Sequence, residues 1–318
     1  DNFIYIVVNN MNILITGGAG FIGSNLAKHL SKNNKVIAID NLSSGLKSQI
    51  PTSKNIKFYK KDINDKKISK YFKNIDAVFH LAAFSSVVEC QERPDKVILN
   101  NINGSENIFS LSIKYNVKVL VYAETSALYE GSNKYPSIEN EIIPRTIYAW
   151  SKLVNHWQAK SFSAVSNTKF VGLRYLNVYG VNQDIRREFP PVMGSFINSI
   201  LSGKRPYING DGTKKRDFIY IDDVNLFHEK LLKTNLKKHQ VINVGTGKNY
   251  SINQIYQIIS NKLKYNKKPV YKKNIDYEAH QNLASTKLMK KIFPNKLTSL
   301  KIGLEKYTDI ILEKKNKT

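Results

Sequence analysis

The segment TGGAGFIGSNLAKHL places Gly17, Gly20 and Gly23 at a G-x-x-G-x-x-G spacing, directly after the apolar run NILIT and at the start of an amphipathic stretch. Glycines at this spacing permit a tight turn between a strand and a helix and let the two elements pack closely. They also allow a pyrophosphate to approach the backbone amides at the positive end of the helix dipole. We therefore expect the fold to start with a strand–turn–helix unit that binds a dinucleotide.

Short apolar runs continue to alternate with amphipathic stretches until about residue 180. Runs that predict strands are NILITG, KVIAID, IKFYKKDI, DAVFHLAA, KVLVYA and KFVGLRYLNV, and stretches that predict helices include FIGSNLAKHLSK, NIFSLSIKYN and a long one from Tyr148. Strands that alternate with helices form a doubly wound parallel sheet, so the α/β class is expected.

This pattern divides the chain into three segments. Residues 1–10 precede Met11 and are interpreted as an upstream tail. Residues 11–180 are predicted to form the dinucleotide-binding domain. The less regular residues 181–318 are predicted to form a smaller, mainly substrate-binding α/β part that shares some strands with the first domain.

Composition excludes several classes of function. The net charge of +24 comes from lysines scattered over every segment, so no nucleic-acid partner is expected, although the excess helps to attract a small anionic substrate. No apolar run approaches the roughly 20 residues that cross a bilayer, so no membrane partner is expected. The lone Cys90 fits a reducing compartment and a cytoplasmic location. The six histidines show no ligand spacing, and no metal is expected.

Asp40 selects the dinucleotide. It ends the strand-like run VIAID, 17 residues after Gly23, where a carboxylate can accept hydrogen bonds from an adenosine ribose. Its negative charge would repel a 2'-phosphate, so NAD is expected rather than NADP. The alternative is a plain glycine turn with Asp40 as a helix cap.

A second pair of residues predicts chemistry. Tyr148 and Lys152 are four residues apart in RTIYAWSKL, so on a helix their side chains lie one turn apart on the same face. An ammonium beside a phenol favours the phenolate and lowers the tyrosine pKa from its usual value of about 10. Tyr148 is therefore a candidate general base.

Together these motifs resemble the extended short-chain dehydrogenase/reductase superfamily, in its nucleotide-sugar epimerase and dehydratase branch. The resemblance covers residues 11 to about 312, through TGGAGFIG, HLAA, NNINGSENI, the YxxxK pair, LRYLNVYG, NGDGTKKRDFIYIDDV, NVGTG and TSLKIGLEK. It implies a Rossmann sheet and bound NAD. The cofactor-binding residues that it implies are Gly17, Gly20, Phe21, Ile22, Gly23, Asp40, Asn41, Gly45, Asp62, Ile63, Leu81, Ala82, Ala83, Asn101, Tyr148, Lys152 and Tyr175.

The resemblance also assigns Thr125, in VYAETSALYEG, as the catalytic hydroxyl beside Tyr148 and Lys152. Dehydratase and decarboxylase relatives carry acidic residues where this chain has Ser126 and Ala127. Glu124 departs from the small residue that is usual in the family. Either it points away from the cofactor and pairs with a nearby base, or it supplies an acid/base carboxylate that would revive dehydratase-type chemistry.

On the substrate side, the resemblance implies contacts from Ser86, Thr125, Asn177, Val192, Asn209, Arg216 and Gln281. Gln281 corresponds to the position that gates sugar size, and it leaves open whether N-acetylated sugars are accepted. The family usually has an Arg and an Asp near residues 272–278, and the nearest candidates in this chain are Lys272, Lys273 and Asp276. A homodimer formed by the helices near 94–115 and 148–165 is also implied.

These residues lead to one expected activity, the NAD-dependent inversion of C4 in a UDP-hexose or UDP-N-acetylhexosamine through a transient 4-keto sugar. Two alternatives remain open. One is a dehydratase, or an epimerase of another sugar or carbon, in the same branch. The other is a non-catalytic NAD-binding protein, against which the intact trio of Thr125, Tyr148 and Lys152 argues.

Overall fold

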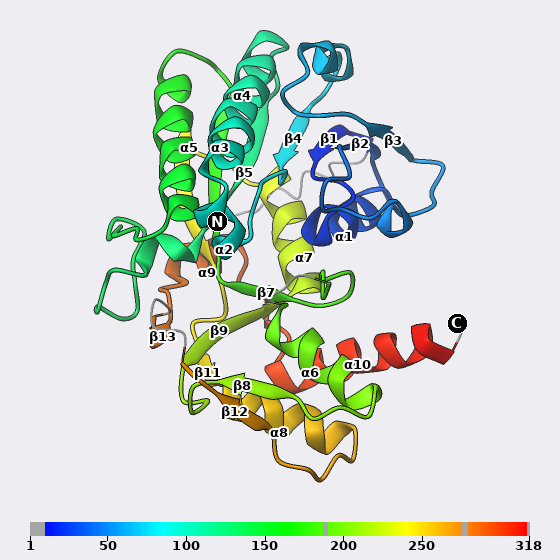
Figure 1. The fold of residues 1–318 in the computed structure, drawn as a ribbon. Helices are drawn as coiled ribbons and strands as arrows, with labels where there is room; N and C mark the ends of the chain where they lie inside the picture. The colour runs from blue at the N-terminus through cyan, green and yellow to red at the C-terminus, as the bar shows by residue number, and fades with distance from the viewer. Residues whose placement is uncertain (1–9, 187–189, 275–278, 317–318) are drawn as a thin grey trace.

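The computed structural model describes residues 10–186, 190–274 and 279–316, and its centre is a sheet of seven parallel strands (Figure 1). Their order is β10-β6-β5-β4-β1-β2-β3, and every neighbouring pair is parallel. The strands are β1 (Asn12–Thr16), β2 (Lys35–Asp40), β3 (Ile56–Lys60), β4 (Ala77–His80), β5 (Val119–Thr125), β6 (Lys169–Tyr175) and β10 (His239–Val244). The prediction of a doubly wound α/β fold is confirmed.

Helices cover both faces of this sheet. On one face lie α2 (Val87–Glu92), α3 (Pro94–Val97), α4 (Gly104–Lys114) and α5 (Ile147–Ala164). On the other face α1 (Phe21–Leu30) packs beside α7 (Ile221–Leu232), and α9 (Lys287–Ile292) contacts β10. The turn of chain between α3 and α4, residues 98–103, continues the helical path with a wider π-type turn.

The large sheet has a hydrophobic core on each face, and successive side chains along a strand contribute alternately to one core and the other. Leu14, Leu120 and Phe170 face the α4 and α5 side, whereas their chain neighbours Val121 and Val171 face the α1 and α7 side. Alternation of side chains across a strand explains this split. Because both faces are covered, the strands are apolar almost throughout.

Outside the layers of the large sheet, the described residues form two small sheets and further helices. The strands are β7 (Asn177–Tyr179), β8 (Tyr207–Asn209), β9 (Lys215–Tyr220), β11 (Asn249–Ser251), β12 (Val270–Lys272) and β13 (Gln281–Asn282). The helices are α6 (Val192–Leu201), α8 (Ile252–Lys262) and α10 (Leu300–Asn316). The start of α8 is fixed by a capping box in which Ser251 and Gln254 satisfy each other's backbone amides.

The prediction of KFVGLRYLNV as one strand is wrong, because this segment forms two strands. KFVGLRYLNV divides at Leu176, whose amide still bonds to the Val244 carbonyl of the large sheet at 2.9 Å. The next strand, β7, leaves that sheet and pairs with β9. In the opposite direction, α7 and β10 return from the second part to the large sheet.

Candidate active site

A cleft of about 410 Å³ opens at the carboxyl ends of the large sheet. Six strands contribute a lining residue at or just after their last position: Gly17, Asp40, Lys61, Leu81, Thr125 and Tyr175. Open α/β sheets bind ligands at this edge. Where the strand order reverses, the loops after neighbouring strands run in opposite directions and leave a crevice between them.

The glycine turn at the cleft has no room for side chains. Gly17 has a φ of +70°, and a Cβ there would lie 2.7 Å from the Ala82 nitrogen. A Cβ on Gly23 would lie 2.1 Å from the Gly17 carbonyl oxygen. Gly20 caps α1 without a side chain, so the first amides of the helix face the cleft uncovered. This cradle fits the diphosphate of a dinucleotide.

Asp40 lines the cleft and holds the loops that follow β1 and β2. Its Oδ2 accepts a hydrogen bond from the Ala19 amide at 3.0 Å, and its Oδ1 accepts one from the Leu42 amide at 2.7 Å. A carboxylate has about four acceptor positions, so two remain for ribose hydroxyls.

The three predicted catalytic residues border the same cleft. Thr125 ends β5, and its Oγ1 accepts a hydrogen bond from the Ala127 amide at 3.1 Å, which leaves the hydroxyl proton available to a ligand. Tyr148 and Lys152 lie one turn apart on α5, with the Lys152 Nζ 6.0 Å from the centroid of the Tyr148 ring. Thr146 caps this helix through the Ala149 amide and so fixes where Tyr148 stands.

Lys152 is buried, and burial lowers its pKa to about 8, because an ammonium is costly away from water. The charge of Glu124 acts in the opposite sense and favours the ammonium. The nearby His80 stays neutral, since burial and the charge of Lys152 lower its pKa to about 3. Its ring nitrogens contact Thr16 at 2.7 Å and Ser105 at 2.9 Å.

Most of the predicted cofactor residues line the cleft together. They are Gly17, Gly20, Phe21, Ile22, Gly23, Asp40, Asn41, Gly45, Ile63, Leu81, Ala82, Ala83, Tyr148, Lys152 and Tyr175. Two stand behind the lining. Asp62 accepts a hydrogen bond from Asn41 at 2.8 Å, and Asn101 clamps the backbone of Phe84.

Of the predicted substrate residues, Thr125 alone borders this cleft within the described residues. Asn177, Arg216 and Gln281 meet on the small sheet formed by β7, β9 and β13. The Asn177 amide donates to the Asp217 carbonyl at 3.0 Å. These positions stay predictions.

The other substrate candidates are more dispersed. Ser86 caps α2, Val192 begins α6, and Asn209 ends β8 beside Lys272 of β12. Asp276 lies outside the described residues.

Several residues of the cleft were missed by the sequence analysis. They come from strands β5 and β7, from loops after strands, from the turn 98–103 and from the segment after β7: Ser43, Ser44, Gln49, Lys61, Phe84, Ser85, Asn100, Ala123, Leu176, Val178, Asn182, Gln183, Asp184 and Pro191. For Ser43 and Ser44 the signal was present, because they directly follow the strand that ends in Asp40. For Asn182 to Asp184 no local motif pointed to the cleft.

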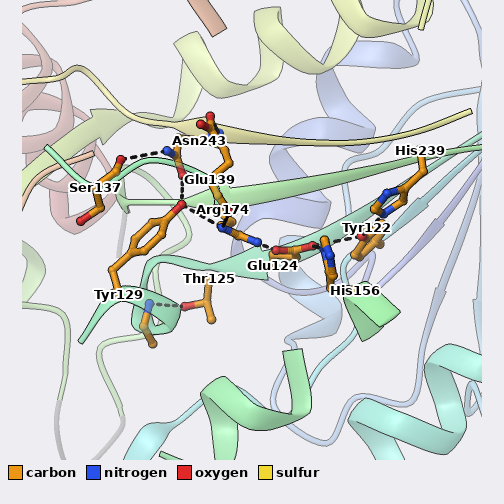
Figure 2. A network of polar contacts seen from close by, with 11 residues as sticks. Tyr122, Glu124, Thr125, Tyr129, Ser137, Glu139, His156, Arg174, His239 and Asn243 are labelled. Carbon is orange, nitrogen blue, oxygen red and sulfur yellow. Dashed lines mark hydrogen bonds and ion pairs between the residues drawn. The ribbon is translucent and has the colours of Figure 1, made fainter. Parts of the chain in front are cut away.

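Glu124 borders the cleft, but its carboxylate is turned into the core (Figure 2). Its Oε2 lies 2.6 Å from the Arg174 Nε, and its Oε1 lies 3.1 Å from the His156 Nδ1. Of the two readings of this residue, the geometry favours pairing with nearby bases.

The comparisons with known proteins agree with this geometry. Residues 13–245 match the NAD dependent epimerase/dehydratase family. The chain belongs to this family. The predictions of a family enzyme and of NAD as its cofactor are thereby confirmed.

Individual relatives extend over nearly the whole chain. A putative UDP-glucose 4-epimerase of Methanocaldococcus jannaschii is 35% identical over 278 residues, which cover 85% of this chain and 88% of the relative. The structure is similar to UDP-N-acetylglucosamine 4-epimerase from Methanobrevibacter ruminantium M1, solved with UDP-N-acetylmuramic acid, at 32% identity and a TM-score of 0.92, covering 96% of this chain and 100% of that one. It is also similar to UDP-glucuronic acid 4-epimerase from Bacillus cereus, solved with UDP-glucuronic acid and NAD, at 28% identity and a TM-score of 0.88, covering 95% and 99%.

In the described part of the chain, none of the helices has the length and apolar content that crossing a membrane requires. Among the same residues, no group of three or more His, Cys, Asp or Glu side chains is arranged to hold a metal ion.

Proposed function

We propose that this protein is a nucleotide-sugar 4-epimerase that inverts C4 of a UDP-hexose or UDP-N-acetylhexosamine through a transient 4-keto sugar. The observation that carries the proposal is the meeting of Thr125, Tyr148 and Lys152 in the cleft that also holds the glycine turn and Asp40. Hydroxyl, phenol and ammonium groups at that place suit the removal and return of a proton at a sugar hydroxyl.

Each of the three side chains has a defined task in this reaction. Tyr148 takes the proton of the C4 hydroxyl as a general base and returns it at the end of the cycle. Lys152 stabilises the phenolate form of Tyr148 by its charge. The Thr125 hydroxyl, oriented by the Ala127 amide, donates to the reacting oxygen. When bound, NAD supplies the hydride acceptor and donor for C4.

The surroundings of Thr125 support epimerisation over elimination of water. Elimination needs an acid and a base placed beside the sugar, and the chain has Ser126 and Ala127 where dehydratase relatives carry carboxylates. The carboxylate of Glu124, next to Thr125 in the sequence, is held in the core by Arg174 and His156. The UDP-sugars in the relatives' names support a UDP-sugar substrate for this chain.

The test is incubation of the purified protein with UDP-glucose, UDP-N-acetylglucosamine and UDP-glucuronic acid, followed by proton NMR of the sugar ring. We expect inversion of C4 with no change of mass for at least one of them. Loss of 18 mass units would indicate a dehydratase instead. Absence of any product with all three sugars, from protein that retains NAD, would contradict the proposal.

A further inference from the structure

Behind Thr125 lies a buried ion cluster centred on Glu124 and Arg174 (Figure 2). Both side chains are fully buried, and the ion pair between them measures 2.6 Å. The second carboxylate oxygen accepts a hydrogen bond from the Tyr122 hydroxyl at 3.0 Å and lies 3.1 Å from the His156 Nδ1. Arg174 continues the cluster to the Tyr129 hydroxyl at 3.0 Å.

The contacts of Glu124 keep it ionised. Burial alone would raise the pKa of its carboxyl group, but the hydrogen bond from His156 and the charge of Arg174 outweigh burial and hold that pKa below its usual value. Conversely, Arg174 has a raised pKa, since the attraction of Glu124 outweighs its burial. A charge that is removed from water is tolerated only when it is paired and hydrogen-bonded in this way.

The Glu124 side chain points away from the place where the sugar hydroxyl would react. Side chains alternate across a strand, and Leu120 and Tyr122 of β5 face the side of the sheet that α4 and α5 cover. Glu124 continues that series toward His156, whereas the next residue, Thr125, points the other way. Glu124 is therefore placed to influence the reaction indirectly, through neighbouring residues, and not by exchanging a proton with the sugar.

The proposed catalytic residue that the charge of Glu124 affects is Lys152. Tyr148, Lys152 and His156 follow each other at intervals of four along α5, so they form one row on the helix. The contact between Glu124 and His156 thus ties the end of β5 to the turn of α5 next to Lys152.

Several titratable groups surround Lys152, and Glu124 differs from the others in the size of its effect on the Lys152 ammonium. The titratable groups that act on Lys152, or on which it acts, are Tyr148 of its own helix, Glu124 of β5, Cys90 of α2 and His80 of β4. His80 is neutral, and of the two groups that raise the pKa of Lys152, Glu124 and the buried Cys90, Glu124 has the larger effect.

We propose that Glu124 is a positioning residue for Lys152, whose negative charge keeps the Lys152 ammonium protonated and whose contact with His156 fixes that turn of α5 beside the end of β5. The inference rests on the proposed epimerase reaction, in which the ammonium stabilises the Tyr148 phenolate. Its sign is definite. Removal of the Glu124 charge makes Lys152 lose its proton at lower pH.

The charge is tested by pH profiles of kcat for C4 inversion by wild type, Glu124→Gln and Glu124→Asp. We expect wild-type activity to fall as pH rises through the pKa of Lys152, about 8. In Glu124→Gln this alkaline limb moves to lower pH, so that kcat is about three- to tenfold below wild type at pH 8.5 and within about twofold at pH 6.5. Glu124→Asp keeps the charge and therefore the wild-type limb. Glu229→Gln, which removes the carboxylate partner of His29 elsewhere, is the matched control.

The link to α5 is tested separately by His156→Asn, which leaves the Glu124–Arg174 pair in place. We expect kcat to fall about three- to tenfold while KM for the UDP-sugar stays within about twofold. His29→Asn is the control, because it removes another contact between a histidine and a carboxylate. This variant decides the inference if Glu124→Gln fails to fold.

The outcomes separate the two proposals. A wild-type alkaline limb in folded, NAD-containing Glu124→Gln, or unchanged kcat and KM in His156→Asn, would overturn the positioning role while epimerisation by the wild type stands. Absence of C4 inversion by the wild type itself would overturn the proposed function and, with it, this inference.

Discussion

At the scale of single residues, Tyr148 is distinguished from the other tyrosines near the sheet by its neighbour. Burial raises the pKa of Tyr122 and of Tyr175, so their hydroxyls remain protonated hydrogen-bond donors. Tyr122 donates to Glu124, and the Tyr175 hydroxyl pairs with the His228 ring at 2.6 Å. Tyr148 instead has the Lys152 ammonium one turn away. The proposed role of Tyr148 as a general base therefore depends on both residues.

Replacement of Tyr148 by Phe tests the base directly. Because the change removes the hydroxyl and keeps the ring, we expect kcat for C4 inversion to fall about 10²- to 10⁴-fold, the contribution usual for general base catalysis. The amount of NAD released on denaturation, measured by mass spectrometry, should stay within about twofold. Tyr115→Phe, outside the cleft at the end of α4, is the matched control. A Tyr148→Phe variant with near wild-type kcat would rule out this base.

At the scale of elements, the glycine turn joins β1 to α1 by contacts that no side chain can replace. Gly23→Ala places a Cβ 2.1 Å from the Gly17 carbonyl oxygen, whereas Gly20→Ala places one 3.2 Å from the same atom. We expect Gly23→Ala to lose its bound NAD and to lower the free energy of unfolding by about 1–3 kcal/mol, as overpacking does. Gly20→Ala should cost clearly less stability. Thermal unfolding of both variants compares them, and equal effects would contradict this description of the turn.

The same elements indicate how far sequence reasoning reaches. The glycine turn and the pair of Tyr148 and Lys152 are local patterns, so spacing alone predicts their geometry. The break at Leu176 left no such trace, because the apolar pattern runs through it without change. The neighbours of Glu124, His156 and Arg174, lie 32 and 50 positions along the chain, and a contact at that separation is set by tertiary packing. The sequence therefore marked Glu124 as unusual, but only the structure identified His156 and Arg174 as the residues that contact it.

At the scale of the whole molecule, the chain crosses between its two parts more than once. The last strand of the large sheet, β10, and the helix α7 both follow residue 180 in sequence. β7 and β9, by contrast, form a parallel pair outside that sheet. Because the connections run in both directions, the cleft at the strand ends is lined by segments far apart in the sequence.

The outer surface of α5 carries the remaining prediction, a homodimer. Trp150 and Trp157 are seven residues apart on the side of α5 away from the row of Tyr148 and Lys152, and they are 55% and 54% exposed. Ile98 and Leu99, on the segment that packs beside α5, are also half exposed. Large apolar side chains gathered on neighbouring elements are typical of a covered interface, and a two-fold axis would place each patch against its copy.

Light scattering of the purified chain is therefore expected to give twice its mass of 36.3 kDa. Trp157→Glu inserts a charge into the patch and should shift the protein to the monomer mass, because an unpaired charge is costly in an apolar interface. Ile302→Glu, an equally exposed apolar position on α10, should leave the mass unchanged. If the wild type itself elutes at 36.3 kDa over a hundredfold range of concentration, the apolar surface of α5 has another purpose than self-association.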